Sequence, residues 1–181
     1  MSTVGRALVT WEQFLQWPDP EPGFHHELQN GEVVLVAPPR PLHLLVQSVL
    51  VEWLTKEAAE RGRGDKEFPY RPAKDLQFWS ADVAYVPKED WRQMRGDEYP
   101  VYAPPLVVEV LSPSNRKTKI AEQRTLSFAA GTKEFWVIDT EKRAIQVFAR
   151  DGKERSYDFN DTVPVSVLPG SSLILSRLLK D

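Results

Sequence analysis

The sequence predicts an α/β or α+β fold in which a mixed β-sheet is flanked by two main helices. Apolar residues recur at helical spacing through residues 42–61, which is typical of an amphipathic helix. Several short runs rich in valine, isoleucine and aromatic residues have the patterns of strands. The chain has 181 residues and no internal repeat, so we expect a single domain over residues 1–181 that is long enough to bury a core.

The N-terminal third contains three clear local signals. Thr10 followed by Gln13 is a capping-box pattern, which predicts a short helix over residues 11–17. Asn30-Gly31 is typical of a type I′ turn and predicts a β-hairpin. The long helix that follows is expected to end at Gly62 and Gly64. The two strands of the predicted hairpin are residues 25–29 and 32–37.

The rest of the chain has the sequence patterns of several strands and of one further long helix. The run LVVEVL at 106–111 is apolar with a single charge, as in a buried central strand. A helix is expected over 117–130 and should end at Gly131. Residues 88–94 are expected to form a short helix or loop, and 172–179 a weaker strand or helix. The other predicted strands are 67–71, 75–79, 82–86, 134–139 and 144–149.

Composition limits the classes of function. The absence of cysteine excludes disulfides, thiolate metal sites and thiol nucleophiles, and no run is apolar enough to predict a membrane helix or signal peptide. A cytoplasmic location is therefore expected. The net charge of −3 argues against a protein that coats nucleic acid by bulk electrostatics, but not against an enzyme with local basic patches. There are two such patches, each of which by itself is typical of a solvated surface: Arg61, Arg63 and Lys66, and Arg116, Lys117, Lys119 and Arg124.

Two carboxylates fall within predicted core strands. Glu109 should share a strand face with Val107 and Leu111, and Asp82 should share one with Ala84 and Val86. A buried carboxylate needs a partner, since an isolated charge is costly to bury. If the two strands are neighbours, a hard divalent cation would relieve the repulsion between these side chains. Salt bridges or exposure at strand ends are the structural alternatives.

The helix at 117–130 places further polar groups nearby. Lys119, Gln123 and Ser127 recur at a spacing of four residues and so line one side of this helix. Because the helix follows Glu109 through a short turn, it should fold back near the end of that strand. An ammonium group there could pair with Glu109, orient a water molecule and stabilise a phosphate. The alternative is a polar stripe that faces solvent.

Other catalytic patterns are weak or absent. His43 and Gln47 lie one helical turn apart, whereas His25 and His26 would point to opposite faces of a strand, so the sequence does not favour a histidine zinc site. Glu27 follows them in the hairpin, where by itself it is typical of a solvated strand carboxylate. The sequence contains no phosphate-binding P-loop, no dinucleotide-binding glycine motif and no nucleophile elbow.

Several motifs together resemble the Uma2 family of restriction-type endonucleases. They are HELQNGEVVLVAPP, then His43, SADVAYVP, PPLVVEVLSPSN and AAGTKEFWVID, in the family's order and spread over residues 10–148. This family is assigned to the PD-(D/E)xK nuclease superfamily. The resemblance implies a restriction-endonuclease-like mixed sheet flanked by helices, with an N-terminal β-hairpin. It also implies a phosphodiesterase site that uses Mg²⁺ or Mn²⁺.

The resemblance assigns roles to individual positions. Asp82 matches the aspartate of the family's Pro-Asp motif, Glu109 the second metal ligand, and Glu27 an outlying acidic residue. Two departures are present. Ala81 replaces the proline before Asp82, and no lysine stands two residues after Glu109. In the family a lysine is commonly supplied by the following helix, at a position that matches Gln123, whereas Lys119 stands one turn earlier.

The leading hypothesis is a magnesium-dependent endonuclease with DNA as the expected partner. Asp82, Glu109 and Glu27 would hold the Mg²⁺ or Mn²⁺, while Lys119 or Gln123 would position the water or the phosphate. The rival hypothesis is a binding or interaction module on the same fold with decayed catalysis, which the displaced lysine and the acidic net charge favour. The recognition sequence, the choice between DNA and RNA, and the choice between monomer and homodimer stay open.

Overall fold

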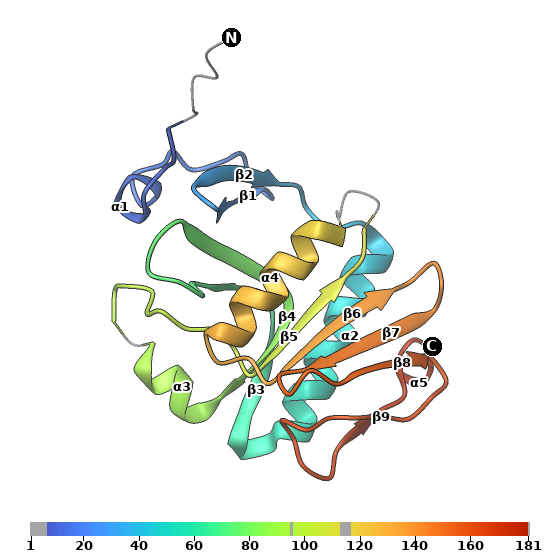
Figure 1. Ribbon diagram of the computed structural model, residues 1–181. Helices are drawn as coiled ribbons and strands as arrows, with labels where there is room; N and C mark the ends of the chain where they lie inside the picture. Colours follow the sequence, from blue (N-terminus) through green and yellow to red (C-terminus); the bar gives the residue numbers. More distant parts are fainter. Residues whose placement is uncertain (1–6, 95, 113–116, 181) are drawn as a thin grey trace.

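The computed structural model describes residues 7–94, 96–112 and 117–180, with only the backbone described for Lys117. An eight-stranded sheet forms the centre, and it is covered by α4 on one face and by α2 on the other (Figure 1). The helices are α1 (Trp11–Phe14), α2 (Pro41–Ala58), α3 (Lys88–Gln93), α4 (Lys117–Ala129) and α5 (Leu175–Leu178). The strands are β1 (His25–Gln29), β2 (Glu32–Val36), β3 (Gly62–Tyr70), β4 (Gln77–Pro87), β5 (Leu106–Val110), β6 (Glu134–Asp139), β7 (Ala144–Ala149), β8 (Glu154–Asp158), β9 (Val163–Pro164) and β10 (Ser172–Leu173).

The sheet is mixed. Its strand order is β2-β1-β4-β5-β6-β7-β8, with β3 paired to β4 as an additional neighbour. β5 and β6 are parallel and are joined through α4, while the other pairs in this sheet are antiparallel. A parallel pair needs a crossover connection, which α4 provides. The predicted fold class is therefore confirmed.

Most predicted elements are present, with small changes of boundary. The Thr10–Gln13 capping box forms, and Asn30 and Gly31 both adopt the positive φ that the hairpin turn requires. The prediction of separate strands at 75–79 and 82–86 was wrong, because they are one continuous strand, β4. The helix predicted to reach residue 61 ends at Ala58 and continues as a 3₁₀ turn, and β8 was not predicted. The short turn expected between Glu109 and the following helix includes residues 113–116, which lie outside the described residues.

Two apolar clusters hold the layers together. On the α2 face, Leu50 and Leu54 pack with Val83, Val108 and Trp136. On the α4 face, Ile120 packs with Trp79, Val107, Phe135 and Val137. Alternate residues of β5 and β6 enter the two clusters, as expected for strands buried on both faces. Among the described residues, no helix is long and apolar enough to cross a membrane.

One stretch of β4 has an incomplete ladder. β1 pairs with Gln77 and Phe78 at the start of β4, and β5 pairs with residues 83–85 further along. In the described part of the chain, residues 79–82 pair with neither β1 nor β5. Asp82 is also skipped in the ladder with β3, where Glu67, the residue opposite in register, has a φ of 48°. The sheet therefore opens a gap between β1 and β5, into which side chains can reach.

The close contact between α2 and β3 generates a test of the packing. A Cβ atom added at Gly64 would lie 2.8 Å from the carbonyl oxygen of Val51 and 2.9 Å from Leu54 Cβ. We expect Gly64→Ala to lower the free energy of unfolding by about 1–3 kcal/mol, since overpacking displaces the helix. The matched control is Gly96→Ala, because a Cβ at Gly96 meets nothing within 4 Å. Urea unfolding of both variants checks this, and equal stabilities would contradict it.

Candidate metal centre

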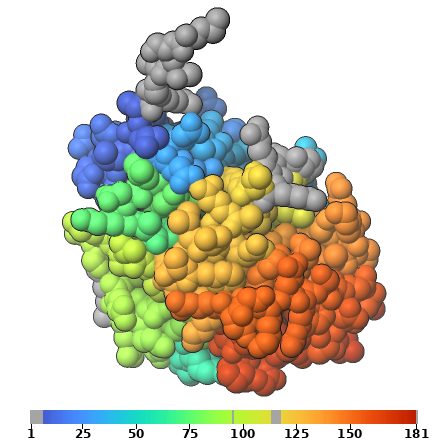
Figure 2. All heavy atoms as spheres, in the orientation of Figure 1, coloured from blue at the N-terminus to red at the C-terminus, as the bar shows by residue number. Residues whose placement is uncertain are grey.

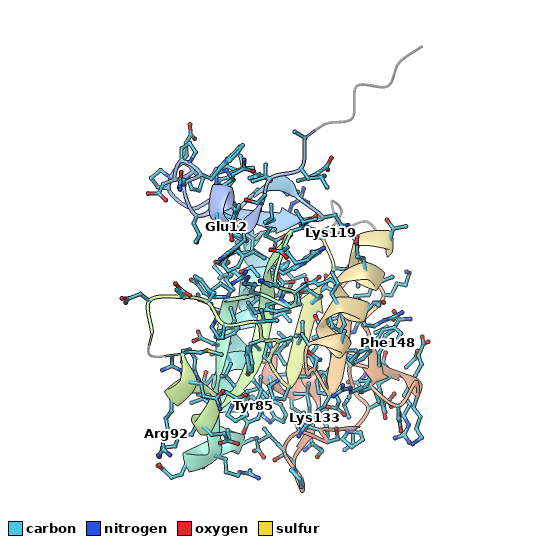
Figure 3. The ribbon with its side chains drawn as sticks, turned by 60° about the vertical axis from the view of Figure 1, so that its left-hand side comes forward. Glu12, Tyr85, Arg92, Lys119, Lys133 and Phe148 are labelled. Carbon is cyan, nitrogen blue, oxygen red and sulfur yellow. The ribbon has the colours of Figure 1, made fainter. Side chains whose placement is uncertain are left out.

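Three carboxylates from three strands meet at the gap in the sheet. They belong to Glu27 of β1, Asp82 of β4 and Glu109 of β5. Their charges interact, because both Asp82 and Glu27 raise the pKa of Glu109. The N-terminal half of α4 lies beside them, and Lys119 is near the end of α4 that faces the β1–β2 hairpin (Figure 3).

Asp82 is held from two directions. Its Oδ2 accepts a hydrogen bond from the Val110 backbone amide at 2.7 Å, so the carboxylate takes the place of a strand partner for β5. Its Oδ1 accepts a hydrogen bond of 3.2 Å from Gln47 Nε2 and lies 3.0 Å from His43 Nε2. Gln47 and His43 are one turn apart on α2, so this helix fixes the orientation of the Asp82 side chain.

The expected face for Asp82 was wrong. Trp79 and Ala81 pack in the same cluster as Ala84 and Val86, so the alternation of side chains along β4 shifts by one residue between 81 and 84. Asp82 consequently contacts α2 instead of continuing the face of Ala84 and Val86. The cause is the local break in the β3–β4 ladder opposite Glu67, which the sequence pattern does not reveal.

Glu109 is buried with little compensation for its charge. Its side chain is on the α4 face of β5, is 7% exposed, and accepts a hydrogen bond of 2.8 Å from Gln123 Nε2. Burial raises the pKa of Glu109 well above its usual value, and the nearby charges of Asp82 and Glu27 raise it further. The hydrogen bond from Gln123 and the charge of Lys119 lower this pKa but do not outweigh the other effects.

Glu27 is equally buried but is well compensated. It is 4% exposed, which rules out the solvated position that the sequence left open. Its Oε1 accepts a hydrogen bond of 3.0 Å from the Ser80 amide, and its Oε2 lies 3.3 Å from Lys119 Nζ and also accepts a hydrogen bond from Gln29. Burial alone would raise the pKa of Glu27, but His25, Lys119 and these hydrogen bonds together hold it below its usual value.

The polar stripe of α4 faces inward, not toward solvent. Gln123 and Ser127 are buried, and Lys119 is one-third exposed. Lys119 forms its ion pair with Glu27 rather than with Glu109, and its Nζ is 5.6 Å from the centre of the Trp79 ring. Ser127 Oγ hydrogen-bonds the hydroxyl of Tyr70 at 2.9 Å. The stripe therefore contacts Glu27 through Lys119 and Glu109 through Gln123, whereas Asp82 is held from the α2 side.

The remaining sequence candidates lie in several places. His43 joins the site through Asp82, and His25 Nε2 is 3.9 Å from Glu27 Oε1. The first basic patch is partly committed to local structure, since Arg61 donates to carbonyl oxygens of α2 and Arg63 stacks over Trp91. In the second patch, Arg124 stacks over Phe148, while Arg116 and the side chain of Lys117 lie outside the described residues.

The donor chemistry of the site fits a hard divalent cation. Asp82 and Glu109 offer carboxylate oxygens, and their repulsion would be relieved by a cation between them. Within the described residues, however, no three His, Asp or Glu side chains already form a ligand group. Glu27 is occupied by Lys119 and the Ser80 amide. Two carboxylates with water and substrate oxygens are the kind of ligand set that Mg²⁺ uses.

Comparisons with known proteins show the family of this chain and agree with its fold. The model of the Uma2 family, described as a putative restriction endonuclease, matches residues 11–176. The chain belongs to the Uma2 family. A crystal structure of a putative nuclease belonging to DUF820 from Anabaena variabilis has the same fold, with a TM-score of 0.79 and 22% sequence identity. The match covers 94% of this chain and 97% of that one. No protein in the search of curated proteins matches this Uma2 chain.

The contrast between Glu109 and Glu27 predicts opposite effects of removing a charge. In EDTA at neutral pH, Glu109→Gln should raise the melting temperature, because it removes a buried charge that burial and repulsion destabilise. Glu27→Gln should lower the stability by roughly 1–3 kcal/mol, because buried donors lose a charged acceptor. Differential scanning calorimetry measures both, and effects of the same sign would contradict the charge balance described for this site.

Proposed function

We propose that this Uma2 protein is a magnesium-dependent endonuclease that hydrolyses phosphodiester bonds in DNA. The observation that carries the proposal is the pair Asp82 and Glu109 at the strand gap, with an unbalanced negative charge beside a partly exposed lysine. Membership of a family of restriction-type endonucleases supports the same chemistry. Mg²⁺ or Mn²⁺ would be held by Asp82 and Glu109, with Glu27 as the outlying carboxylate.

The chain's own residues supply positioning and charge. When bound, the cation would activate water and shield the charge that develops on the phosphate. Gln47, His43 and the Val110 amide hold the Asp82 carboxylate in position, so the groups that orient it are already in place. Gln123 fixes Glu109 in the same way. The energetic cost of orienting the two carboxylates is therefore met during folding and not during the reaction.

We propose that Lys119 is the cationic side chain that interacts with the substrate. Its ion pair with Glu27 holds the ammonium at the mouth of the gap, and one-third of its side chain is exposed. From there it can donate to a phosphate oxygen or to the attacking water. Gln123 is buried against Glu109 and is uncharged, so we assign it to positioning that carboxylate. We therefore propose that Lys119, one helical turn before Gln123, takes the role of the family's lysine in this chain.

The first activity prediction concerns Asp82. Purified protein should cut DNA only with Mg²⁺ or Mn²⁺ present, and Asp82→Asn should slow cleavage at least about 100-fold, since metal-ion catalysis contributes several kcal/mol. The matched control is Asp19→Asn, which makes the same chemical change at an exposed aspartate. Initial rates on supercoiled and linear DNA, with RNA in parallel, provide the measurement.

The outcomes of this assay separate the two hypotheses. Cleavage that survives EDTA and Asp82→Asn would place the activity elsewhere or in a contaminant. Absence of cleavage on DNA and RNA with every metal tested would favour the decayed binding module. In that case, a DNA-binding measurement at several salt concentrations would show whether the module retains nucleic acid.

The second activity prediction ranks the two α4 residues. Lys119→Met keeps the length of the side chain but removes its charge, and should reduce the cleavage rate by about 10²–10³-fold, as expected for loss of a charge-stabilising donor. Gln123→Ala should reduce it by about 10–100-fold, in the range found for residues that hydrogen-bond to metal ligands. Single-turnover rates at saturating Mg²⁺ provide the test, and the opposite ranking would refute the assignment of Lys119.

A further inference from the structure

A hollow lies at the far end of the sheet from the carboxylates. It has a volume of about 310 Å³, at the lower end of the range for small-molecule pockets of about 300–1,000 Å³. The ends of β6, β7 and β8 and the segment around Pro164 and Ser166 form its walls. Residues of β7 and β8 reach the surface at the lower right of Figure 2, away from the hairpin.

The sheet register explains why the hollow is polar. On the α2 face, one cross-strand row runs through Val108, Trp136, Val147 and Arg155, so an apolar row ends in a guanidinium group. The next row places Glu134 beside Leu106 and Ala149. A carboxylate and a cation therefore stand on the same face of the sheet, just where the apolar cluster on this face ends.

Glu134 lines this hollow and has one carboxylate oxygen without a hydrogen-bond partner among the described residues. Its side chain is 5% exposed, and its Oε1 accepts a hydrogen bond of 3.2 Å from the Ser166 amide. Its Oε2 is buried and has no hydrogen-bond partner among the described residues. A buried carboxylate oxygen without a donor is costly, so a ligand that brings an N–H group would be bound favourably there.

The rim of the hollow has the opposite charge. Lys133, Arg150 and Arg155 are exposed and form no ion pair with the acidic residues that the structure describes, whereas Lys153 is paired with Asp151. This local excess of positive charge stands out in a chain with a net charge of −3. Arg and Lys at a rim favour phosphate, which arginine can bind through two parallel hydrogen bonds.

The hollow is separate from the candidate metal centre. Glu134 pairs with Leu106 in the β5–β6 register, three residues before Glu109, which is roughly 10 Å along the strand. Glu109 lies on the α4 face, whereas Glu134 shares the α2 face with Trp136. In Figure 3, Lys119 accordingly lies beside the hairpin, whereas Lys133 lies well apart from it toward the lower part of the molecule.

We propose that this hollow binds a nucleotide whose base carries an exocyclic amine. The amine would donate to Glu134 Oε2, as carboxylates accept from the N4 amine of cytosine. The phosphate would lie against Arg150 and Arg155, and the ring would pack on Tyr157, which also lines the hollow. Such a ligand brings a hydrogen-bond donor to the buried carboxylate and an anion to the basic rim. Thymine lacks the amine and should bind poorly.

Isothermal titration of the full chain with dCMP and dTMP tests the proposal. Wild-type protein should bind dCMP at least about tenfold more tightly than dTMP, because one base contact of this kind discriminates by about that factor or more. Glu134→Gln should abolish or reverse the preference, since the amide can donate to the O4 of thymine. Arg150→Ala should weaken both nucleotides without changing their ratio. Lys142→Ala, whose lysine pairs with Asp139 outside the hollow, should change nothing.

The same titration with 5′-phosphorylated oligo(dC) distinguishes a free nucleotide from a strand end, since either can deliver this chemistry. Tighter binding of the oligonucleotide assigns the hollow to a strand end, and equal binding assigns it to the free nucleotide. Lack of binding by dCMP and by the oligonucleotide would overturn the proposal, as would a base preference that Glu134→Gln leaves unchanged. If Glu134→Gln fails to fold, Arg150→Glu is tested in its place. Loss of nucleotide binding in this variant would support the proposal, and unchanged binding would overturn it. These measurements need no cleavage, so they stand apart from the nuclease proposal.

Discussion

The interrupted ladder of β4 is the constraint on which the site depends. Buried backbone N–H groups need an acceptor. At the gap, the described residues of β4 pair with neither β1 nor β5, so side chains have to supply acceptors there. Glu27 supplies it for the Ser80 amide, and Asp82 supplies it for the Val110 amide. The two carboxylates thus complete the sheet while they concentrate negative charge at one point. Replacing either by an apolar residue would remove the acceptor that the structure shows for a backbone N–H group.

The groups around this gap compensate the negative charges of Glu27 and Glu109 to different extents. Glu27 has the ammonium of Lys119 and several donors, so its ionised form is stabilised. Glu109 has the amide of Gln123, which donates one hydrogen bond and carries no charge. A lysine at position 123 would neutralise Glu109 internally, whereas the lysine one turn earlier neutralises Glu27. The displacement of the lysine therefore leaves the pair Asp82 and Glu109 as the part of the site that gains most from an external cation.

Local sequence signals predicted most of the fold because they arise from local physics. The Thr10 capping box, the Asn30-Gly31 turn and the apolar run at 106–111 each specify one element without tertiary information. The burial of Gln123 and Ser127 agrees with the stripe read on α4, although periodicity alone could not say which way it faced. The side-chain shift at Asp82 was not predictable, since it results from a ladder break between distant residues. The role of β8 was missed because the segment ERSYD is mostly exposed.

The hairpin is fixed over the site by the same helix that lines it. Lys119 pairs with Glu27 of β1, and Glu122, on the next turn of α4, accepts a hydrogen bond from Asn30 in the hairpin turn. Asn30 in turn accepts a hydrogen bond of 2.6 Å from Gln77 at the start of β4. The turn residue that the sequence marks for its backbone conformation thus also joins α4 to β4 through its side chain. Position 30 therefore requires asparagine for two reasons, since glycine would satisfy the positive φ but would break the link between the hairpin and the helix that carries Lys119.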